Sequence, residues 1–160
     1  MERLTEGGVA AEHLFTLRAE IGPRQDAGPG PTGSRSYNGV VRGAFEGPRL
    51  RGEILPGSAD WMLVRPDGSI EMDARAVLRT DDGAIIHMSY GGRIGIPADI
   101  LDAARDPARR AALDPDRYYL RTAPTFETGA PAYAWLNNLV AVGKGRLLAD
   151  GVGYDVFAVL

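Results

Sequence analysis

The fold is constrained most by a series of strand-length segments that alternate with turn sequences between Arg35 and Tyr90. The turn sequences are EGP, PGS, RPDGS and TDDGA, and an Asp-Gly pair tolerates the positive φ angles of tight hairpin turns. The segments between them are SYNGVVRGAF, RLRGEIL, DWMLVR, SIEMDARAVLRT and AIIHMSY. Segments of this length joined by short turns predict an antiparallel meander.

The flanking segments extend this pattern with two exceptions. In EHLFTLRAEIG, apolar residues alternate with polar ones, which predicts a half-buried strand with Phe15, Leu17, Ala19 and Ile21 on one face. Residues 22–34 are rich in glycine and proline, so we expect a long, flexible loop there rather than regular structure. The segment between Pro97 and Pro115 is rich in alanine, leucine and arginine and predicts one or two short helices.

Strands resume in RYYLRTAPTFET, and the C-terminal segment LNNLVAVGKGRLLADGVGYDVFAVL predicts a last hairpin. Roughly eight or nine strands favour a closed up-and-down barrel, because closure removes sheet edges and a barrel of this size holds one small ligand. The expected fold is therefore mainly all-β, a single antiparallel β-barrel domain over residues 1–160 with an internal pocket. A two-sheet sandwich is the alternative.

Composition narrows the class of partner. Apolar residues make up 44% of the chain, the net charge is −3 and no basic stripe gathers on one segment, so we expect no nucleic-acid or membrane partner. Cysteine is absent, which excludes disulfides and thiolate chemistry. The start MERLTEGGVAAEHLF shows no basic-then-apolar leader. We expect a cytoplasmic protein whose partner is a small molecule, and homo-oligomerisation stays open.

Several motifs in a fixed order carry a family resemblance. They are a Gly-x-Arg opening, PGxxDW, DxR, DDGA, RTxPxFET and YxWLN. From about Gly33 to the C-terminus, this series resembles the family known as domain of unknown function 3237, also called the UPF0311 family. The resemblance implies a compact β-barrel with an internal pocket, and it brings no catalytic residues. Ser58 stands where a second glycine is expected, which puts the local turn geometry in doubt.

Two acidic residues are candidates for a general base. Asp73 and Arg75 are two residues apart and project from the same face of a strand, and either that face or its opposite could line the interior. They form either a surface ion pair or a pair inside the pocket, and the family-like motif favours the pocket. Asp60 and Trp61 leave the LPGS turn with opposite orientations, so Asp60 is either an inward acid or a cap of its own turn.

Other polar and aromatic residues are candidates for binding. Arg35 begins a strand and could bind an anion or a carbonyl, and Tyr118 could donate to a developing oxyanion. Tyr119 and Arg121 share the opposite strand face, and Trp61 is expected to be a wall residue. Four further residues suggest a pocket rim: Glu127, Tyr133, Trp135 and Asn137. We interpret Asp81 and Asp82 as turn residues.

The chain contains none of the motifs that bind common cofactors. His13 and His87 are its only histidines and have no partners at metal-ligand spacing, and there is no Gly-x-Ser-x-Gly elbow, P-loop or dinucleotide fingerprint. We expect no metal and no cofactor. The sequence favours a cofactor-independent acid–base enzyme (isomerase, cyclase, hydratase or dehydratase) for a small carbonyl-containing or aromatic molecule, with Asp60 or Asp73 as base. The alternative is a non-catalytic barrel that binds a small molecule.

Overall fold

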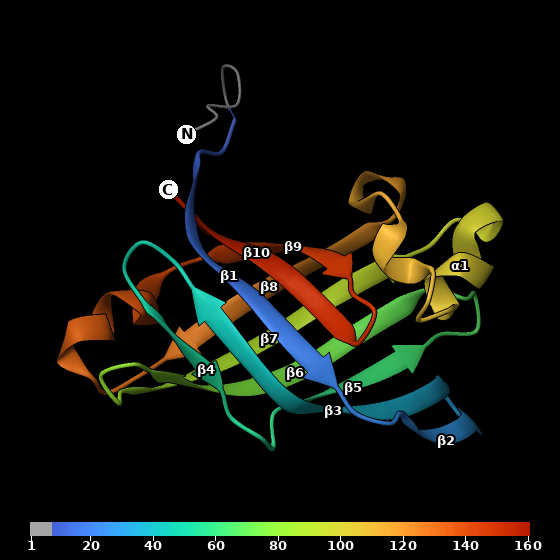
Figure 1. The fold of residues 1–160 in the computed structure, drawn as a ribbon, viewed down its shortest axis with the longest axis horizontal. Helices are drawn as coiled ribbons and strands as arrows, with labels where there is room; N and C mark the ends of the chain where they lie inside the picture. The colour runs from blue at the N-terminus through green and yellow to red at the C-terminus, as the bar shows by residue number, and fades with distance from the viewer. Residues whose placement is uncertain (1–7) are drawn as a thin grey trace.

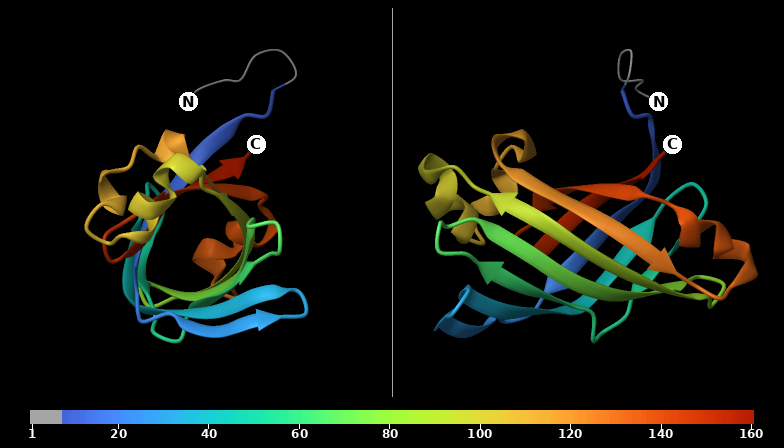
Figure 2. Two further views of the ribbon diagram at one scale, coloured as in Figure 1. Left: turned by 90° about the vertical axis from the view of Figure 1, so that its right-hand side faces the viewer. Right: turned by 180° about the vertical axis from the view of Figure 1, so that it is seen from behind.

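Ten strands of one antiparallel sheet close into a barrel in this computed structural model, which describes residues 8–160. The barrel closes because β1 (Ala11–Ile21) pairs with β10 (Gly151–Val159) on one side and with β3 (Gly33–Glu46) on the other. Figure 1 shows the barrel from the side, and Figure 2 includes a view close to its axis. The remaining neighbours follow the order β9 (Ala141–Leu147), β8 (Tyr119–Glu127), β7 (Ile85–Gly95) and β6 (Ile70–Thr80). The predicted antiparallel barrel is confirmed.

Two short strands share one position in this barrel. The first half of β3 pairs with β5 (Ala59–Val64) and its second half with β4 (Arg51–Ile54), while β6 pairs with the same two strands on their other side. The circumference therefore has eight strand positions. A barrel of about eight strands has an interior that side chains can fill or that can hold one small ligand.

Ser58 bridges the interruption between these two strands. Its hydroxyl donates to the Leu55 carbonyl at 2.8 Å and accepts the Val77 N–H at 3.0 Å, and the residue is almost fully buried. A short polar side chain can replace a missing backbone partner in this way. The serine at the expected glycine position therefore closes the break in the sheet, and the chain continues directly into Ala59 and Asp60.

The glycine- and proline-rich segment is a strand, so its prediction as a flexible loop was wrong. β2 (Gln25–Gly30) pairs with the start of β3, where Pro29 lies opposite Ser34. Proline has no N–H to donate, which an edge strand tolerates, and β2 lies at the free edge of its hairpin. Gly28 adopts a φ of 77° where the register shifts. Glycine and proline exclude a central strand but not this one.

One end of the barrel is filled by side chains and covered by a helix that the sequence analysis did not predict. The 3-10 helix η4 (Pro131–Asn138) lies at the left-hand end in Figure 1 and buries Leu136 completely. In the same core cluster, the Phe15 ring contacts Phe45 and Phe126 edge-on, with centroid distances of 5.6 and 6.0 Å. Substantial helix was expected only between Pro97 and Pro115.

The other end carries the helical segment that was predicted. It consists of η1 (Ala98–Ile100), α1 (Leu101–Arg105), η2 (Arg110–Ala112) and η3 (Pro115–Arg117), which connect β7 to β8 at the right-hand end in Figure 1. Ile100 and Ala104 are buried against the barrel. Among residues 8–160, no helix has both the length and the apolar character to cross a membrane.

Candidate functional site

A cavity of about 480 Å³ lies inside the barrel, toward the end that carries α1. This volume is within the range of roughly 300–1,000 Å³ that is usual for small-molecule sites. Its wall is mainly apolar, with side chains such as Ile21, Val40, Met62, Met72, Ile94 and Leu120. Among the residues that line it, Asp60 is the only carboxylate.

Strand register brings four lining or neighbouring residues into one row across the barrel wall. Asn38 of β3 pairs with Asp60 of β5, Asp60 with Ala74 of β6, and Ala74 with Tyr90 of β7. Because Ala74 is small, the side chains of its neighbours on either side can approach each other over it. Asp60 and Tyr90 therefore flank the same part of the cavity.

The Asp60 carboxylate is half-buried and accepts one backbone hydrogen bond. Its Oδ1 accepts the Asp73 N–H at 3.0 Å. β5 pairs with β6 at Ala59–Asp60 and again at Leu63–Val64, and this bond lies between the two paired stretches. The carboxylate therefore takes part in the hydrogen bonding between the two strands. Burial raises the pKa of Asp60 to about 6, the Asp73 N–H opposes this, and the Asp73 charge adds to it.

Two tyrosines face the same cavity as Asp60. The rings of Tyr90 and Tyr154 meet edge-on with centroids 5.7 Å apart. Burial raises the pKa of Tyr90 strongly, and the nearby Asp60 charge raises it further. Burial, Tyr90 and Asp60 raise the pKa of Tyr154 in the same direction. Both hydroxyls are therefore neutral donors at physiological pH.

Arginines take part in the wall near the α1 end. Arg24 follows β1, Arg105 ends α1, and Arg110 begins η2. The Arg110 guanidinium donates to the carbonyls of Leu148 and Ala149 at 2.6 and 2.8 Å. The cavity thus combines an apolar body, one carboxylate and a cationic mouth.

The structure separates the residues that were predicted to be catalytic. Asp73 is exposed on the outer side of β6, because Met72 and Ala74 on the alternate face are buried. Arg75 shares the outer, exposed face of Asp73, although its strand position belongs to the cavity wall. The prediction that Asp73 points into the interior was wrong, since the other face of the strand is the inner one, whereas Arg75 is exposed but contributes to the cavity wall. Only the backbone N–H of Asp73 reaches Asp60.

Tyr118, the other predicted catalytic residue, is a structural core residue. It is 4% exposed, and its hydroxyl accepts the Leu147 N–H at 2.8 Å. That bond joins the chain before β8 to the end of β9. Tyr118 is absent from the cavity wall, so its hydroxyl has a structural partner rather than a ligand to serve.

The predicted binding residues on the strands lie outside the cavity. Arg35 is exposed and donates to the Trp61 carbonyl at 3.2 Å. Trp61 is 40% exposed and packs edge-on against Tyr37. Tyr119 is 55% exposed, and the Arg121 guanidinium lies 5.1 Å from its ring centroid. These contacts lie on the outer surface of the barrel, so none of the four side chains lines the cavity.

The predicted rim residues lie at the opposite, closed end. Asn137 accepts the Thr128 N–H at 2.8 Å and donates to the Thr128 carbonyl at 2.9 Å, which fixes η4 to β8. The Trp135 ring stacks against the Arg49 guanidinium at 3.6 Å. Glu127 is exposed at the end of β8. This group of residues closes the barrel instead of framing its opening.

Asp81 and Asp82 lie in the turn that follows β6, so their prediction as turn residues is confirmed. Asp81 pairs with Arg51 at 2.9 Å, and Asp82 accepts from the Tyr133 hydroxyl at 2.9 Å and from Thr80. Hydrogen bonds, first from Thr80 and then from Tyr133, lower the pKa of Asp82. Tyr133 therefore links η4 to this turn and does not line the cavity that contains Asp60.

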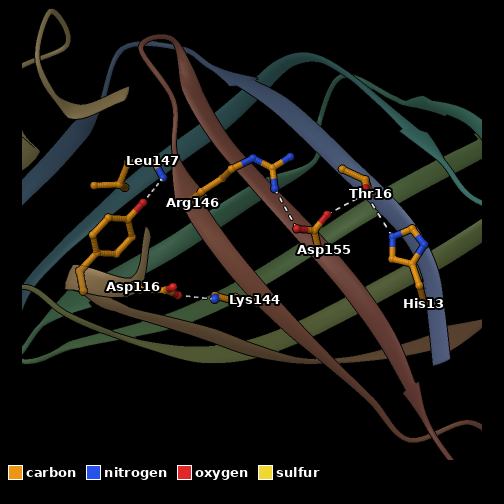
Figure 3. Close-up of polar contacts among 8 residues, drawn as sticks. His13, Thr16, Asp116, Lys144, Arg146, Leu147 and Asp155 are labelled. Atoms are coloured by element: carbon orange, nitrogen blue, oxygen red, sulfur yellow. Dashed lines mark hydrogen bonds and ion pairs between the residues drawn. The ribbon is translucent and has the colours of Figure 1, made fainter. Parts of the chain in front are cut away.

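A second polar group lies on the outer face of β1, β9 and β10 (Figure 3). His13 Nε2 lies 3.1 Å from the Thr16 hydroxyl, which donates to Asp155 at 2.7 Å, and Arg146 pairs with Asp155 at 3.0 Å. A nucleophilic hydroxyl would donate to the histidine, with the carboxylate orienting the ring. Here the hydroxyl donates to the carboxylate instead, so this group is not arranged for nucleophilic catalysis. Among residues 8–160, no group of histidine and acidic side chains could hold a metal ion.

Sequence reasoning missed several cavity residues, and strand alternation could have found some of them. Tyr90 lies on the same strand face as the buried Ile86 and Met88, and Tyr154 lies on the same face as the buried Val156. Three other wall residues carried no comparable signal, since they lie in turns, in short helices or on a strand of mixed pattern: Asn38, Arg105 and Arg110.

The fold and sequence are shared with known proteins. Residues 9–159 match the family described as a protein of unknown function (DUF3237), and the chain belongs to this family. A UPF0311 protein of Rhodopseudomonas palustris is 36% identical over 149 residues, which cover 93% of this chain and 95% of that protein. The crystal structure of a conserved protein of unknown function from Rhodopseudomonas palustris has a TM-score of 0.88 and 34% identity, covering 97% of this chain and 100% of the other.

A more distant solved structure shares the fold alone. It is described as an enzyme from Penicillium herquei, and it matches with a TM-score of 0.72 and 19% identity, over 99% of this chain and 100% of the other.

Proposed function

We propose that this chain is a cofactor-independent acid–base enzyme that acts on a small carbonyl-containing or aromatic molecule inside the barrel. The observation that carries the proposal is the position of Asp60, the one carboxylate on the wall of a mainly apolar cavity, opposite the Tyr90 hydroxyl. Burial of a carboxylate in such surroundings costs free energy, so a carboxylate found there usually has a function. The pKa of about 6 makes Asp60 a stronger base than an exposed aspartate while it remains ionised at neutral pH.

The geometry supports separate roles for Asp60 and Tyr90, which lie on the two sides of Ala74. The Asp73 N–H holds Oδ1 of Asp60, which leaves Oδ2 to take a proton from the substrate. Burial keeps the Tyr90 hydroxyl protonated, so its O–H can donate to a substrate oxygen on which negative charge develops. Asp60 then returns the proton at another atom, which gives isomerisation, or to a departing hydroxyl group, which gives dehydration. Arg35 and Asp73 have no part in this scheme, because their side chains lie outside the barrel.

The apolar wall also suits a protein that binds a small molecule without turning it over. Ligand pockets in general are mainly apolar with a few placed polar groups. The enzyme is favoured over this second function because a hydrophobic ligand alone would not require an ionisable carboxylate beside two tyrosines. The Penicillium herquei protein with the same fold is described as an enzyme, so the barrel is compatible with catalysis.

A ligand screen followed by solvent-deuterium exchange tests the proposal. Ligands are identified by thermal shift, and exchange at carbon is then followed by NMR with wild-type protein, Asp60→Asn and Asp73→Asn. We expect exchange or turnover with wild type and Asp73→Asn, and a loss of about a hundredfold to ten-thousandfold with Asp60→Asn. Tight binding with neither exchange nor turnover would instead support the binding protein.

A further inference from the structure

Two arginines at the mouth of the cavity, Arg105 and Arg110, are not neutralised by the residues around them. Arg110 carries five N–H donors, and its two hydrogen bonds go to backbone carbonyls, which are neutral. Three donors remain, on a guanidinium that is already fixed in place. Arg105, on the same connection between β7 and β8, has no ion-pair partner among residues 8–160.

The acidic side chains of the neighbouring segments are engaged elsewhere or lie off the wall. Asp106 pairs with Arg109 at 2.7 Å, and Asp26 pairs with Arg24 at 3.3 Å. Asp102 of α1 and Asp150 of the β9–β10 turn are exposed and do not line the cavity. The mouth therefore presents at least two unmatched positive charges to whatever enters.

The cationic mouth and Asp60 lie at different depths. The row of Asp60 and Ala74 is four residues along β6 from Ile70, which lies at the start of that strand. At about 3.3 Å per residue this is roughly 13 Å along the strand. An anionic group at the mouth would thus lie much closer to the arginines than to the Asp60 carboxylate, so its attraction to them outweighs its repulsion by Asp60. The wall between the two levels is apolar and includes Met62 and Met72.

We propose that the substrate is an amphipathic organic anion, an inference that rests on the acid–base function proposed for Asp60. Its carboxylate binds Arg105 and Arg110 at the mouth, and its apolar body extends along the methionine and isoleucine side chains. The end of that body reaches Asp60 and Tyr90, where the proton is transferred. A guanidinium matches a carboxylate with two parallel hydrogen bonds, which fixes the orientation in which the molecule enters.

Three probes of the same chain length test the head group. Octanoate, n-octanol and octylammonium are titrated calorimetrically into the wild-type protein, Arg105→Gln, Arg110→Gln and Asp60→Asn. Arg35→Gln is the control, since it removes the same charge from an exposed arginine that lies outside the cavity wall and has no carboxylate partner among residues 8–160. Circular dichroism checks that each variant is folded. Arg110→Gln also removes two hydrogen bonds to the β9–β10 turn, so Arg105→Gln tests the charge of the mouth without that structural change.

We expect wild-type protein to bind octanoate at least about tenfold more tightly than n-octanol and octylammonium. Arg105→Gln and Arg110→Gln should each weaken octanoate binding by about tenfold and leave n-octanol binding unchanged, whereas Arg35→Gln should bind as wild type does. Equal affinity for octanoate and n-octanol, no measurable octanoate binding, or the same loss in Arg35→Gln would overturn the inference. Asp60→Asn should retain octanoate binding, because the head group binds at the mouth. A failure of the acid–base function would therefore appear in a different measurement, as turnover of a substrate that is unchanged in Asp60→Asn.

Discussion

The Asp60 carboxylate lies inside the barrel and accepts the backbone N–H of Asp73 at 3.0 Å, while the Asp73 side chain points outward. Both aspartates were candidate bases in the sequence, and this one bond assigns them different tasks. Asp73 orients the carboxylate through its main chain, so its side chain can change without loss of that contact. Asp60 combines the inward orientation, the apolar surroundings and the raised pKa that proton transfer needs.

The first prediction concerns the pH dependence of the rate. Since the base must be ionised and its pKa is about 6, kcat/KM should reach a plateau above that value and fall about tenfold per pH unit below it. A pH profile of kcat/KM measures this for any substrate that the screen identifies. Asp73→Asn removes the repulsive outer charge, so its midpoint should lie at or slightly below that of wild type. A profile with no acidic limb near pH 6 would exclude Asp60 as the base.

The second prediction concerns stability. Below the unfolded pKa of 3.8, Asp60 is protonated in both states; between 3.8 and about 6 the folded protein keeps the proton that the unfolded chain loses. Stability therefore falls as pH rises through this window and stays low above it, by up to about 3 kcal/mol. Asp60→Asn keeps an oxygen for the Asp73 N–H but carries no charge. It should stabilise the protein by about 1–3 kcal/mol near neutral pH and have little effect below about pH 4.

Urea unfolding at the two pH values measures this difference. Asp73→Asn is the control, because its exposed side chain should change the free energy of unfolding by no more than about 0.5 kcal/mol. If Asp60→Asn destabilised the fold at neutral pH, the carboxylate would be a structural group instead of a strained functional one.

The sequence predicted the barrel because its signals are local. An Asp-Gly turn and a run of alternating residues indicate a strand wherever they occur, and eight or nine of them in series favour closure. The hairpin of β2 was missed because glycine and proline are tolerated at a free sheet edge, and edge position depends on which strands pair. The helix η4 was missed for a similar reason, since the core that buries Leu136 exists only once the strands have assembled into the barrel.

The site depended on register, which a single strand does not contain. Alternation along β6 shows that Asp73 and Met72 face opposite sides, but the choice of the inner side is made by neighbouring strands. The row that joins Asp60 to Tyr90 through Ala74 requires two pairings at once. Asp60 could be proposed from its residue type and its place after a turn, whereas Tyr90 needed the assembled barrel.

The third prediction separates two buried tyrosines. Tyr90→Phe removes the hydroxyl that faces Asp60 and should lower kcat by about tenfold or more with little change in KM. Tyr118→Phe leaves the Leu147 N–H without its partner and should cost about 1–2 kcal/mol of stability, with kcat unchanged in the folded fraction. Steady-state kinetics and urea unfolding of both variants measure the two effects. The reverse outcome, with Tyr118→Phe inactive but stable, would restore the catalytic role that the sequence suggested.

The last prediction tests whether η4 closes the barrel. The Asn137 side chain makes two hydrogen bonds with the Thr128 main chain, and Leu136 beside it is completely buried. Asn137→Ala removes both bonds and should lower the free energy of unfolding by about 1–3 kcal/mol. Asn138→Ala is the matched control, because this exposed neighbour should contribute no more than about 0.5 kcal/mol. Since η4 lies at the end away from α1, ligand affinity should be the same in both variants under conditions where they are folded. Weakened binding in Asn137→Ala with unchanged stability would mean that ligands approach the cavity from the η4 end.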